Sequence, residues 1–144
     1  MTTDTASVNS SAPSTKIVLG VDDAPENLFL LQAAVKAGGY TFMSARSGSE
    51  CLSLLNRVAP RLILLDIEMP NMDGFETCRQ IRAIPGLRQI PIAFLTARKT
   101  AEDVKKCLAV GGNDFIVKPF EMAKLLDRIK HWTARRVGAI PAGA

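Results

Sequence analysis

The sequence has few of the residues that metal-binding and nucleophilic sites most often use. Its 144 residues include one histidine, His131, and three widely separated cysteines. This spacing matches no cysteine-based zinc motif, and an odd number of scattered cysteines indicates buried, reduced thiols in a cytosolic protein. No base–nucleophile arrangement surrounds His131. These shortages exclude a histidine-rich metal site and give no support to a histidine-dependent catalytic site.

Long apolar runs and clusters of one charge are also lacking. No stretch approaches the ~20 apolar residues that a membrane span needs. Residues 1–15 lack the basic start and apolar centre of a signal peptide, so we predict a cytoplasmic protein without membrane contact. The 18 basic and 14 acidic residues give a net charge of +4. Because the basic residues form only pairs with few aromatic neighbours, we predict no direct nucleic-acid binding.

What remains is the composition of one globular domain. The hydrophobic content of 47% and charged content of 22% are ordinary for such a domain. Residues 1–15 are rich in serine and threonine, and residues 137–144 are mostly small residues with one proline. We expect both segments to be disordered tails. The domain itself is predicted to occupy residues 16–136.

Five short strand patterns alternate with five helical patterns inside that domain. Most of the strand patterns are aliphatic runs with little polar alternation, which is typical of strands buried on both faces of a parallel sheet. The predicted strands are 16–21, 40–45, 61–65, 90–95 and 113–117. The predicted helices begin near Pro25, Ser47, Asp73, Thr100 and Met122, most of them at proline or capping signals.

This alternation predicts an α/β fold, a three-layer sandwich built from right-handed βαβ crossovers. We predict a five-stranded parallel sheet of order 2-1-3-4-5, as in flavodoxin-like folds, whose switch point lies between the first and third strands. Apolar spacing predicts that the second helix continues to Val58 and the third to about Ile84. In the fourth helix, Val104, Cys107 and Leu108 are expected to face the core. The last helix carries an apolar stripe at Met122, Leu125, Leu126 and Ile129.

Polar side chains follow four of the five predicted strands. In chain order they are Asp22-Asp23, Asp66, Thr96-Ala97 and Lys118-Pro119. Because the carboxyl ends of parallel strands form one edge of the sheet, we expect these groups to converge there. Three carboxylates held together repel one another and need a cation, and oxygen ligands without histidine or cysteine favour Mg²⁺. A carboxylate, a metal, a lysine and a hydroxyl are the parts that phosphoryl transfer requires.

These motifs resemble those of the receiver domain of two-component response regulators, the CheY-like superfamily of bacterial-type phosphorelay signalling. The resemblance covers about residues 16–133. Its motifs are Val-Asp-Asp at 21–23, Asp-Ile-Glu-Met-Pro at 66–70 with Met-Asp-Gly at 72–74, Leu-Thr-Ala at 95–97, and Lys-Pro-Phe at 118–120. Each motif alone is weak, but the four in this order and spacing are highly specific.

The resemblance implies a phosphoacceptor and a set of metal ligands. Asp66 would accept a phosphoryl group from a phosphohistidine on a sensor histidine kinase or a histidine phosphotransfer protein. Asp23, Asp66 and the backbone carbonyl of Glu68 would bind Mg²⁺. Asp22 would act indirectly, through the waters of the metal and through Lys118.

The resemblance also implies phosphate-binding and switch residues. Thr96, Ala97 and Lys118 would hold the phosphoryl oxygens, and a cis peptide bond would join Lys118 to Pro119. Thr96 and Phe115 would change position on phosphorylation. The change would be read by other proteins at the face formed by the fourth helix, fifth strand and fifth helix.

Two departures from the family pattern bear on function and stability. We hypothesise that the side chains of Glu68 and Arg98 tune how water reaches the phosphorylated aspartate, although both could simply be solvated. Gly20 lies in the first strand, where receivers usually carry a branched aliphatic residue. We expect it to cost some strand stability.

Several functions are compatible with this pattern. The first is a stand-alone signalling switch that catalyses only its own phosphorylation and dephosphorylation, and whose dimerisation on phosphorylation is left open. The second is a receiver excised from a larger regulator or hybrid kinase. A third is a phosphohydrolase, since residues 66–68 faintly resemble the acid-x-acid motif of haloacid dehalogenases, although here that motif follows the third strand and no cap insertion is present. A binding module independent of phosphorylation fits the acidic pocket poorly.

Overall fold

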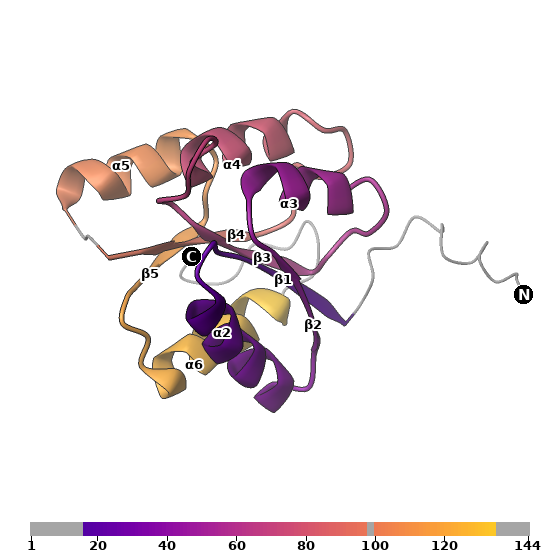
Figure 1. The fold of residues 1–144 in the computed structure, drawn as a ribbon, viewed down its shortest axis with the longest axis vertical. Coiled ribbons are helices and arrows are strands. Elements are labelled where there is room, and N and C mark those ends of the chain that lie inside the picture. The colour runs from indigo at the N-terminus through magenta and orange to yellow at the C-terminus, as the bar shows by residue number, and fades with distance from the viewer. Residues whose placement is uncertain (1–15, 98–99, 135–144) are drawn as a thin grey trace, which may run out of the picture.

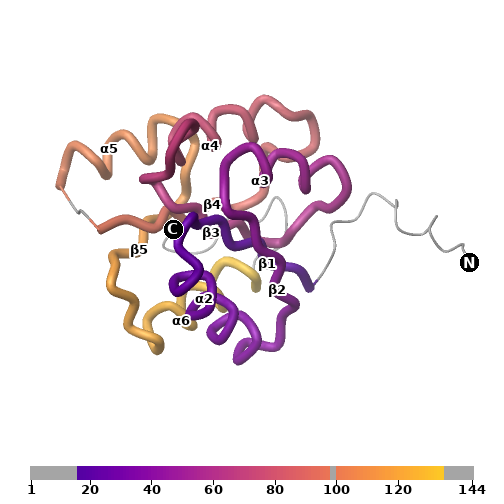
Figure 2. Tube along the Cα trace, viewed as in Figure 1, coloured from indigo at the N-terminus to yellow at the C-terminus, as the bar shows by residue number. Residues whose placement is uncertain are grey.

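A five-stranded parallel sheet forms the middle layer of the molecule in the computed structural model (Figures 1 and 2). Its order is β2-β1-β3-β4-β5, which confirms the predicted topology. The strands are β1 (Ile17–Val21), β2 (Thr41–Ala45), β3 (Leu62–Asp66), β4 (Ile92–Thr96) and β5 (Asp114–Val117). Every residue of β3 and β4 is buried, as the unbroken aliphatic runs predicted.

The structure describes residues 16–97 and 100–134. The predicted tails, 1–15 and 137–144, lie outside the described residues, as does Arg98. The domain limits of 16–136 therefore stay a prediction. Within the described ranges, no helix combines the length and apolar character needed to cross a bilayer.

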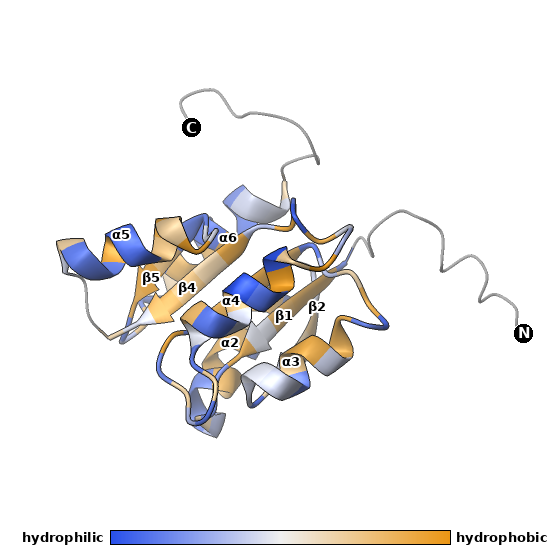
Figure 3. Ribbon diagram, turned by 90° about the horizontal axis from the view of Figure 1, so that it is seen from above, coloured by the Kyte–Doolittle hydropathy of each residue, from blue (hydrophilic) through white to orange (hydrophobic). Residues whose placement is uncertain are grey.

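Two layers of helices enclose the sheet. The helices are α2 (Pro25–Ala37), α3 (Gly48–Leu54), α4 (Gly74–Arg82), α5 (Ala101–Ala109) and α6 (Met122–Thr133). Figure 1 shows α3, α4 and α5 over one face of the sheet and α2 and α6 under the other. The core is accordingly split into two clusters of buried side chains, one on each face. Figure 3 shows apolar β4 at the centre and hydrophilic stretches on α4 and α5.

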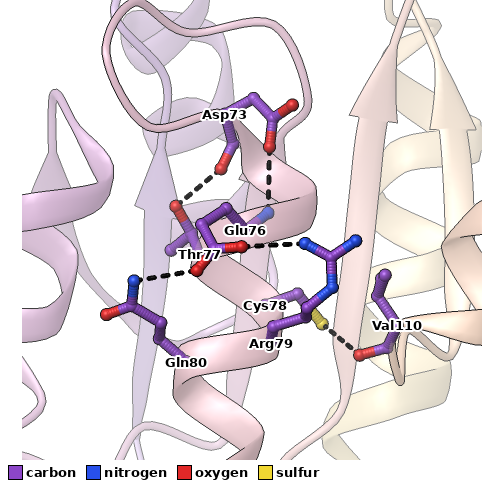
Figure 4. Close-up of polar contacts among 7 residues, drawn as sticks. All are labelled: Asp73, Glu76, Thr77, Cys78, Arg79, Gln80 and Val110. Carbon is purple, nitrogen blue, oxygen red and sulfur yellow. Dashed lines mark hydrogen bonds and ion pairs between the residues drawn. The ribbon is translucent and has the colours of Figure 1, made fainter.

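Side-chain caps set the predicted starts of α3, α4 and α5, whereas α2 and α6 begin without one. Ser47 Oγ accepts a hydrogen bond from the Glu50 backbone N–H at 3.0 Å, at the start of α3. Asp73 Oδ1 accepts one from Glu76 N at 2.9 Å, which begins α4 (Figure 4). Thr100 caps α5 in the same way. Each cap satisfies a backbone donor that has no partner within its own helix.

Two helices end earlier than the apolar spacing predicted. Helix α3 ends at Leu54 rather than continuing to Val58, because the Arg57 N–H turns back to the Leu54 carbonyl at 2.9 Å. Such a bond spans three residues rather than four and tightens the chain into a turn. Helix α4 likewise ends at Arg82, short of the predicted Ile84.

The expected inward faces of α5 and α6 were wrong in part. Cys107 is buried, as predicted, and Val104 is half-buried, but Leu108 is 61% exposed. Adjacent positions on a helix point about 100° apart, so the seating of Cys107 against the core turns Leu108 outward. On α6, Leu125 and Ile129 are buried but Met122 is 41% exposed.

The three cysteines are free and buried. Burial raises the pKa of the Cys51 thiol to about 12 and that of Cys107 to about 11. Both thiols are therefore protonated at neutral pH and poorly reactive. This arrangement agrees with the prediction of buried, reduced cysteines.

Gly20 fills a specific role in the packing between β1 and α2. A Cβ at this position would lie 2.7 Å from Cε1 of Phe42 and 3.1 Å from Cδ1 of Leu31. The aromatic ring of Phe42 therefore occupies the space that a branched side chain would need. Glycine at this position leaves room for that ring, and its expected cost to strand stability stays a prediction.

We expect Gly20→Val to destabilise the protein by about 1–3 kcal/mol, because overpacking forces the Phe42 ring to move. Phe42→Leu should cost less when combined with Gly20→Val than it does alone. Equilibrium urea unfolding of the two single variants and the double variant would measure this coupling. Strictly additive losses would contradict the proposed exchange of volume between the two positions.

Candidate phosphoacceptor and metal site

The predicted site residues meet at the carboxyl edge of the sheet. The parallel register aligns Val21 with Leu65 and Thr96 with Val117, so the residues that follow these strands leave the sheet together. Asp22 follows β1 and is fully buried, and Asp66 ends β3 with 3% of its surface exposed. Two carboxylates are thus removed from water at adjacent strand ends.

Three carboxylates gather at this edge. One oxygen from each of Asp22, Asp23 and Asp66 lies within 4.8 Å of the others. Asp23 is exposed while the other two are buried, so the cluster opens to solvent through Asp23. The side chains come from only two strand ends, the pair that the switch point of the sheet places side by side.

Lys118 bridges the two buried carboxylates. Its Nζ donates a hydrogen bond to Asp66 Oδ1 at 2.9 Å and forms an ion pair with Asp22 Oδ2 at 3.2 Å. The Lys118 backbone N–H donates to the Thr96 carbonyl at 2.7 Å, which fixes the residue beyond the end of β5. The peptide bond between Lys118 and Pro119 is cis, as the resemblance implied.

The local environment shifts the pKa of both partners in the central pair. Burial raises the pKa of Asp66 to about 6, the hydrogen bond from Lys118 opposes this, and the negative charge of Asp22 adds to it. For Lys118, burial by itself lowers the pKa, but the hydrogen bond to Asp66 and the charges of Asp66 and Asp22 outweigh burial and raise it. The ammonium is therefore charged at neutral pH, whereas the Asp66 carboxylate is ionised at a cost.

The donor set fits a divalent cation. With all groups ionised, three carboxylates and one ammonium give −3 + 1 = −2. Among the described residues, Asp22 Oδ2 is a buried side-chain oxygen without a hydrogen bond, since its contact with Lys118 is an ion pair of poor hydrogen-bond geometry. A hard ion with retained waters suits such oxygen-only surroundings, and Mg²⁺ meets that description.

The other predicted site residues lie near this cluster with different exposure. Thr96 ends β4 and is 7% exposed, while Ala97 beyond it is exposed. Phe115 in β5 is half-buried and packs against the core cluster under α3, α4 and α5. The Glu68 side chain is exposed in the loop after β3. Its proposed partner in tuning water access, Arg98, is outside the described residues, so that hypothesis stays a prediction.

The loop after β3 is held against Asp66 by a close backbone approach. The Gly74 N–H donates to the Ile67 carbonyl at 2.7 Å, and a Cβ at Gly74 would lie 2.2 Å from the Asp66 carbonyl oxygen. Only glycine fits here. Sequence reasoning identified Gly74 as part of a helix start, but this contact with Asp66 was missed.

A cation that sequence reasoning missed also lies at this edge. Arg46 follows β2 directly, and its Nη2 donates to the Asp23 backbone carbonyl at 3.4 Å. The rule that identified the other site residues, namely that polar groups after parallel strands converge, could have found it. The predicted site contained the polar residues after the other four strands but not the one after the second.

Fold and site together define a flavodoxin-like α/β domain with an acidic, lysine-bridged pocket at its strand ends, the arrangement of CheY-like signalling domains. The chain belongs to the response regulator receiver domain family, whose model matches residues 18–130.

Relatives of very different length share this domain. The chain is 37% identical over 116 residues to the response regulator PleD of Caulobacter vibrioides, a match that covers 81% of the chain but only 26% of PleD. It is 35% identical over 115 residues to an uncharacterised 14.6 kDa protein of Leptolyngbya boryana, of which 88% is covered. The chain therefore spans about a quarter of the first relative and most of the second.

Solved structures show the same fold. The chemotaxis protein CheY4 of Vibrio cholerae superposes with a TM-score of 0.78 at 29% identity, covering 82% of this chain and 98% of CheY4. The receiver domain of a Pseudomonas aeruginosa sensor histidine kinase has a TM-score of 0.77 at 31% identity, covering 85% of this chain and 100% of that domain. That receiver was solved with a magnesium ion coordinated in its active site cleft.

We expect Asp66→Asn to stabilise the metal-free protein at neutral pH. Because the pKa of Asp66 is about 6 rather than 3.8, the folded state binds a proton more tightly than the unfolded state does. Stability from this group is complete below about pH 4 and is lost as the pH rises through about 6. The gain of the variant at pH 7 should be on the order of 2–3 kcal/mol, since the raised pKa already includes the pair with Lys118.

Urea unfolding in the presence of a chelator would measure this gain. The difference between Asp66→Asn and wild type should be largest at pH 7 and vanish near pH 4. Asp23→Asn removes an exposed carboxylate of the same cluster and should give a smaller gain. A less stable Asp66→Asn at pH 7 would show that the ion pair with Lys118 outweighs the cost of burial.

Proposed function

We propose that this chain is a phosphorylatable receiver that takes a phosphoryl group on Asp66 and signals by changing its protein contacts. The observation that supports this most directly is the bridge from Lys118 Nζ to Asp66 Oδ1 and Asp22 Oδ2. A phosphorylatable carboxylate needs a fixed cation beside it to stabilise the added oxygens. The phosphodonor would be a phosphohistidine on a histidine kinase or a phosphotransfer protein.

The side chains divide the work of the transfer. Lys118 holds Asp66 Oδ1, so we assign the second oxygen, Oδ2, as the nucleophile. The P–N bond of the donor breaks as a P–O bond to Asp66 forms, and the imidazole leaves with the bonding pair. Thr96, the Ala97 backbone and Lys118 would hold the phosphoryl oxygens. When bound by Asp23, Asp66 and the Glu68 carbonyl, with Asp22 acting indirectly, Mg²⁺ would neutralise charge on the transferring group.

A protein donor has an apolar surface beside the site on which to dock. Helix α2 starts directly after the acidic pair at 22–23, and Phe29 on it is 71% exposed. Leu30 beside it is 38% exposed. Exposed aromatic residues are common energetic centres of protein interfaces. We therefore assign the start of α2 to contact with the donor protein.

The opposite side of the pocket supports a readout face made by α5, β5 and α6. Each of these elements carries one large exposed apolar residue: Leu108, Val117 and Met122, respectively. This is the face that the family resemblance implied. We propose that a downstream protein, or a second copy of the chain, binds there when Asp66 is phosphorylated.

A carboxylate links the proposed switch residue to this face. Asp114 accepts hydrogen bonds from the Phe115 backbone N–H at 2.9 Å and from Trp132 Nε1 at 2.8 Å. It also pairs with Arg128 on α6. A movement of Phe115 would therefore be transmitted to α6, which supports the proposed route from Thr96 and Phe115 to the readout face.

The proposed receiver function also suggests a location and a size class for the protein. We propose a cytoplasmic protein that contacts neither membrane nor nucleic acid directly, and that catalyses only its own phosphorylation and dephosphorylation. A stand-alone regulator is our first choice, supported by the relative that the chain covers to 88%. A receiver within a larger regulator or hybrid kinase is the alternative, supported by the match to 26% of PleD.

We expect acetyl phosphate to label wild-type protein once per chain in the presence of Mg²⁺, and Asp66→Ala to remain unlabelled. Intact-protein mass spectrometry after incubation with and without a chelator would measure this. Labelling that persists in Asp66→Ala would refute the assignment of the acceptor. Multiple turnover of p-nitrophenyl phosphate would instead indicate a phosphohydrolase.

We expect Phe29→Ser to slow phosphotransfer from a protein donor by about tenfold, the loss of one interface anchor. Labelling by acetyl phosphate should not change, because a small donor needs no docking surface. Leu108→Ser is the matched control, since it removes an exposed apolar residue from the other face and should leave both rates intact. Equal slowing with both donors would place the defect in the pocket rather than in docking.

A further inference from the structure

One strand end at the acidic edge is not used by the proposed phosphotransfer chemistry. Strands β1, β3, β4 and β5 each deliver a residue to that chemistry, and β2 delivers Arg46. The backbone on both sides of this position is fixed. The Asp22 N–H donates to the Ala45 carbonyl at 3.1 Å, and the Arg46 N–H donates to Glu50 Oε1 at 2.7 Å. The start of the Arg46 side chain is thereby held at the rim of the pocket.

The guanidinium of Arg46 reaches across to Asp23. Its Nη2 donates to the backbone carbonyl of Asp23 at 3.4 Å, a long hydrogen bond and therefore a weak one. Because the contact is with the main chain, it leaves the Asp23 carboxylate free for other ligands. Arg46 and Asp23 are both exposed, so this positive charge stands where solvent and an incoming donor meet the pocket.

The negative charge of the pocket determines how the Arg46 guanidinium affects the binding of ligands. Three carboxylates and Lys118 sum to −2, which attracts a divalent cation. With that cation bound the pocket would be close to neutral, so an anionic phosphodonor would respond mainly to charges at the mouth. A guanidinium there acts on the two ligands with opposite sign. It lowers the attraction for the cation and attracts the anion.

We propose that Arg46 is a specificity-determining residue that favours strongly anionic phosphodonors at the expense of Mg²⁺ affinity. This inference rests on the proposed function, because it concerns the donor of the same site. A purely structural role is the competing explanation, in which Arg46 only steadies the backbone of Asp23. The two roles predict opposite changes in Mg²⁺ affinity when Arg46 is removed. Loss of a structural support would weaken Mg²⁺ binding, whereas loss of an opposing charge would strengthen it.

Arg46→Gln separates these roles when Mg²⁺ binding is measured by isothermal titration calorimetry at low ionic strength. We expect the variant to bind Mg²⁺ about two- to fivefold more tightly than wild type, and the difference to shrink in high salt. Arg46→Lys keeps the charge and should restore the wild-type affinity. Arg57→Gln is the matched control, because it removes an exposed arginine beyond the far end of α3 and should change nothing.

Donor discrimination is the second measurement. At saturating Mg²⁺, Arg46→Gln should be labelled by acetyl phosphate about two- to fivefold more slowly than wild type. Labelling by phosphoramidate, whose ammonium group lowers its net charge, should slow less. Weaker Mg²⁺ binding by the variant, or equal slowing with both donors, would overturn the inference.

The outcome also separates this inference from the function on which it rests. If wild type is labelled on Asp66 but Arg46→Gln behaves identically, only the role of Arg46 fails. If wild type is not labelled by either donor, the proposed function fails and this inference fails with it. Tighter Mg²⁺ binding with selective slowing of acetyl phosphate supports both.

Discussion

Electrostatic repulsion among carboxylates is the constraint on which the rest of this structure depends. The parallel sheet places one oxygen from each of Asp22, Asp23 and Asp66 within 4.8 Å of the others, and two of these side chains are buried. The half-buried ammonium of Lys118 balances only part of this charge. The folded chain therefore contains an unfavourable repulsion among carboxylates, which a bound divalent cation would reduce. The proposed function uses the resulting affinity for the cation. In the proposed function, the site gives up stability in exchange for reactivity, as functional sites often do.

The surrounding structure keeps this unfavourable arrangement in place. Strands β3 and β4 are buried throughout, so Asp66 lies at the end of a fully buried strand. Gly74 brings the following loop onto the backbone of Asp66, and the cap at Asp73 begins α4 at once. Proposed switch elements lie instead on the β5 side, where Phe115 is half-buried. A pocket that passes a structural change to another surface needs a fixed side, here that of β3, and a more loosely packed side, here that of β5.

The sequence predicted the site better than it predicted the ends and faces of helices. Asp22, Asp66 and Lys118 could be placed at one edge because alternating strands and helices predict a parallel sheet, and the chosen strand order put the first and third strands side by side. Leu108 could not, because the rotation of α5 depends on how Cys107 packs in three dimensions. The Phe42 ring fills the space beside Gly20, and this contact joins two different strands. It could not be predicted because no local sequence pattern indicates it. The same holds for Arg82, which donates to the carbonyls of four loop residues: Leu87, Arg88, Ile90 and Gly111.

The Asp114 carboxylate has one more effect, on how copies of this domain can meet. Strand β5 pairs with β4 on one side only, so it is an outer strand with backbone groups available for strand addition. The Phe115 N–H, however, is already bound to Asp114 Oδ1. Arg128 and Trp132 hold that carboxylate in place from α6. A second strand cannot pair with this N–H while the Asp114 carboxylate holds it, which favours association through side chains on this side of the molecule. Such contacts can form and dissociate without disrupting a sheet.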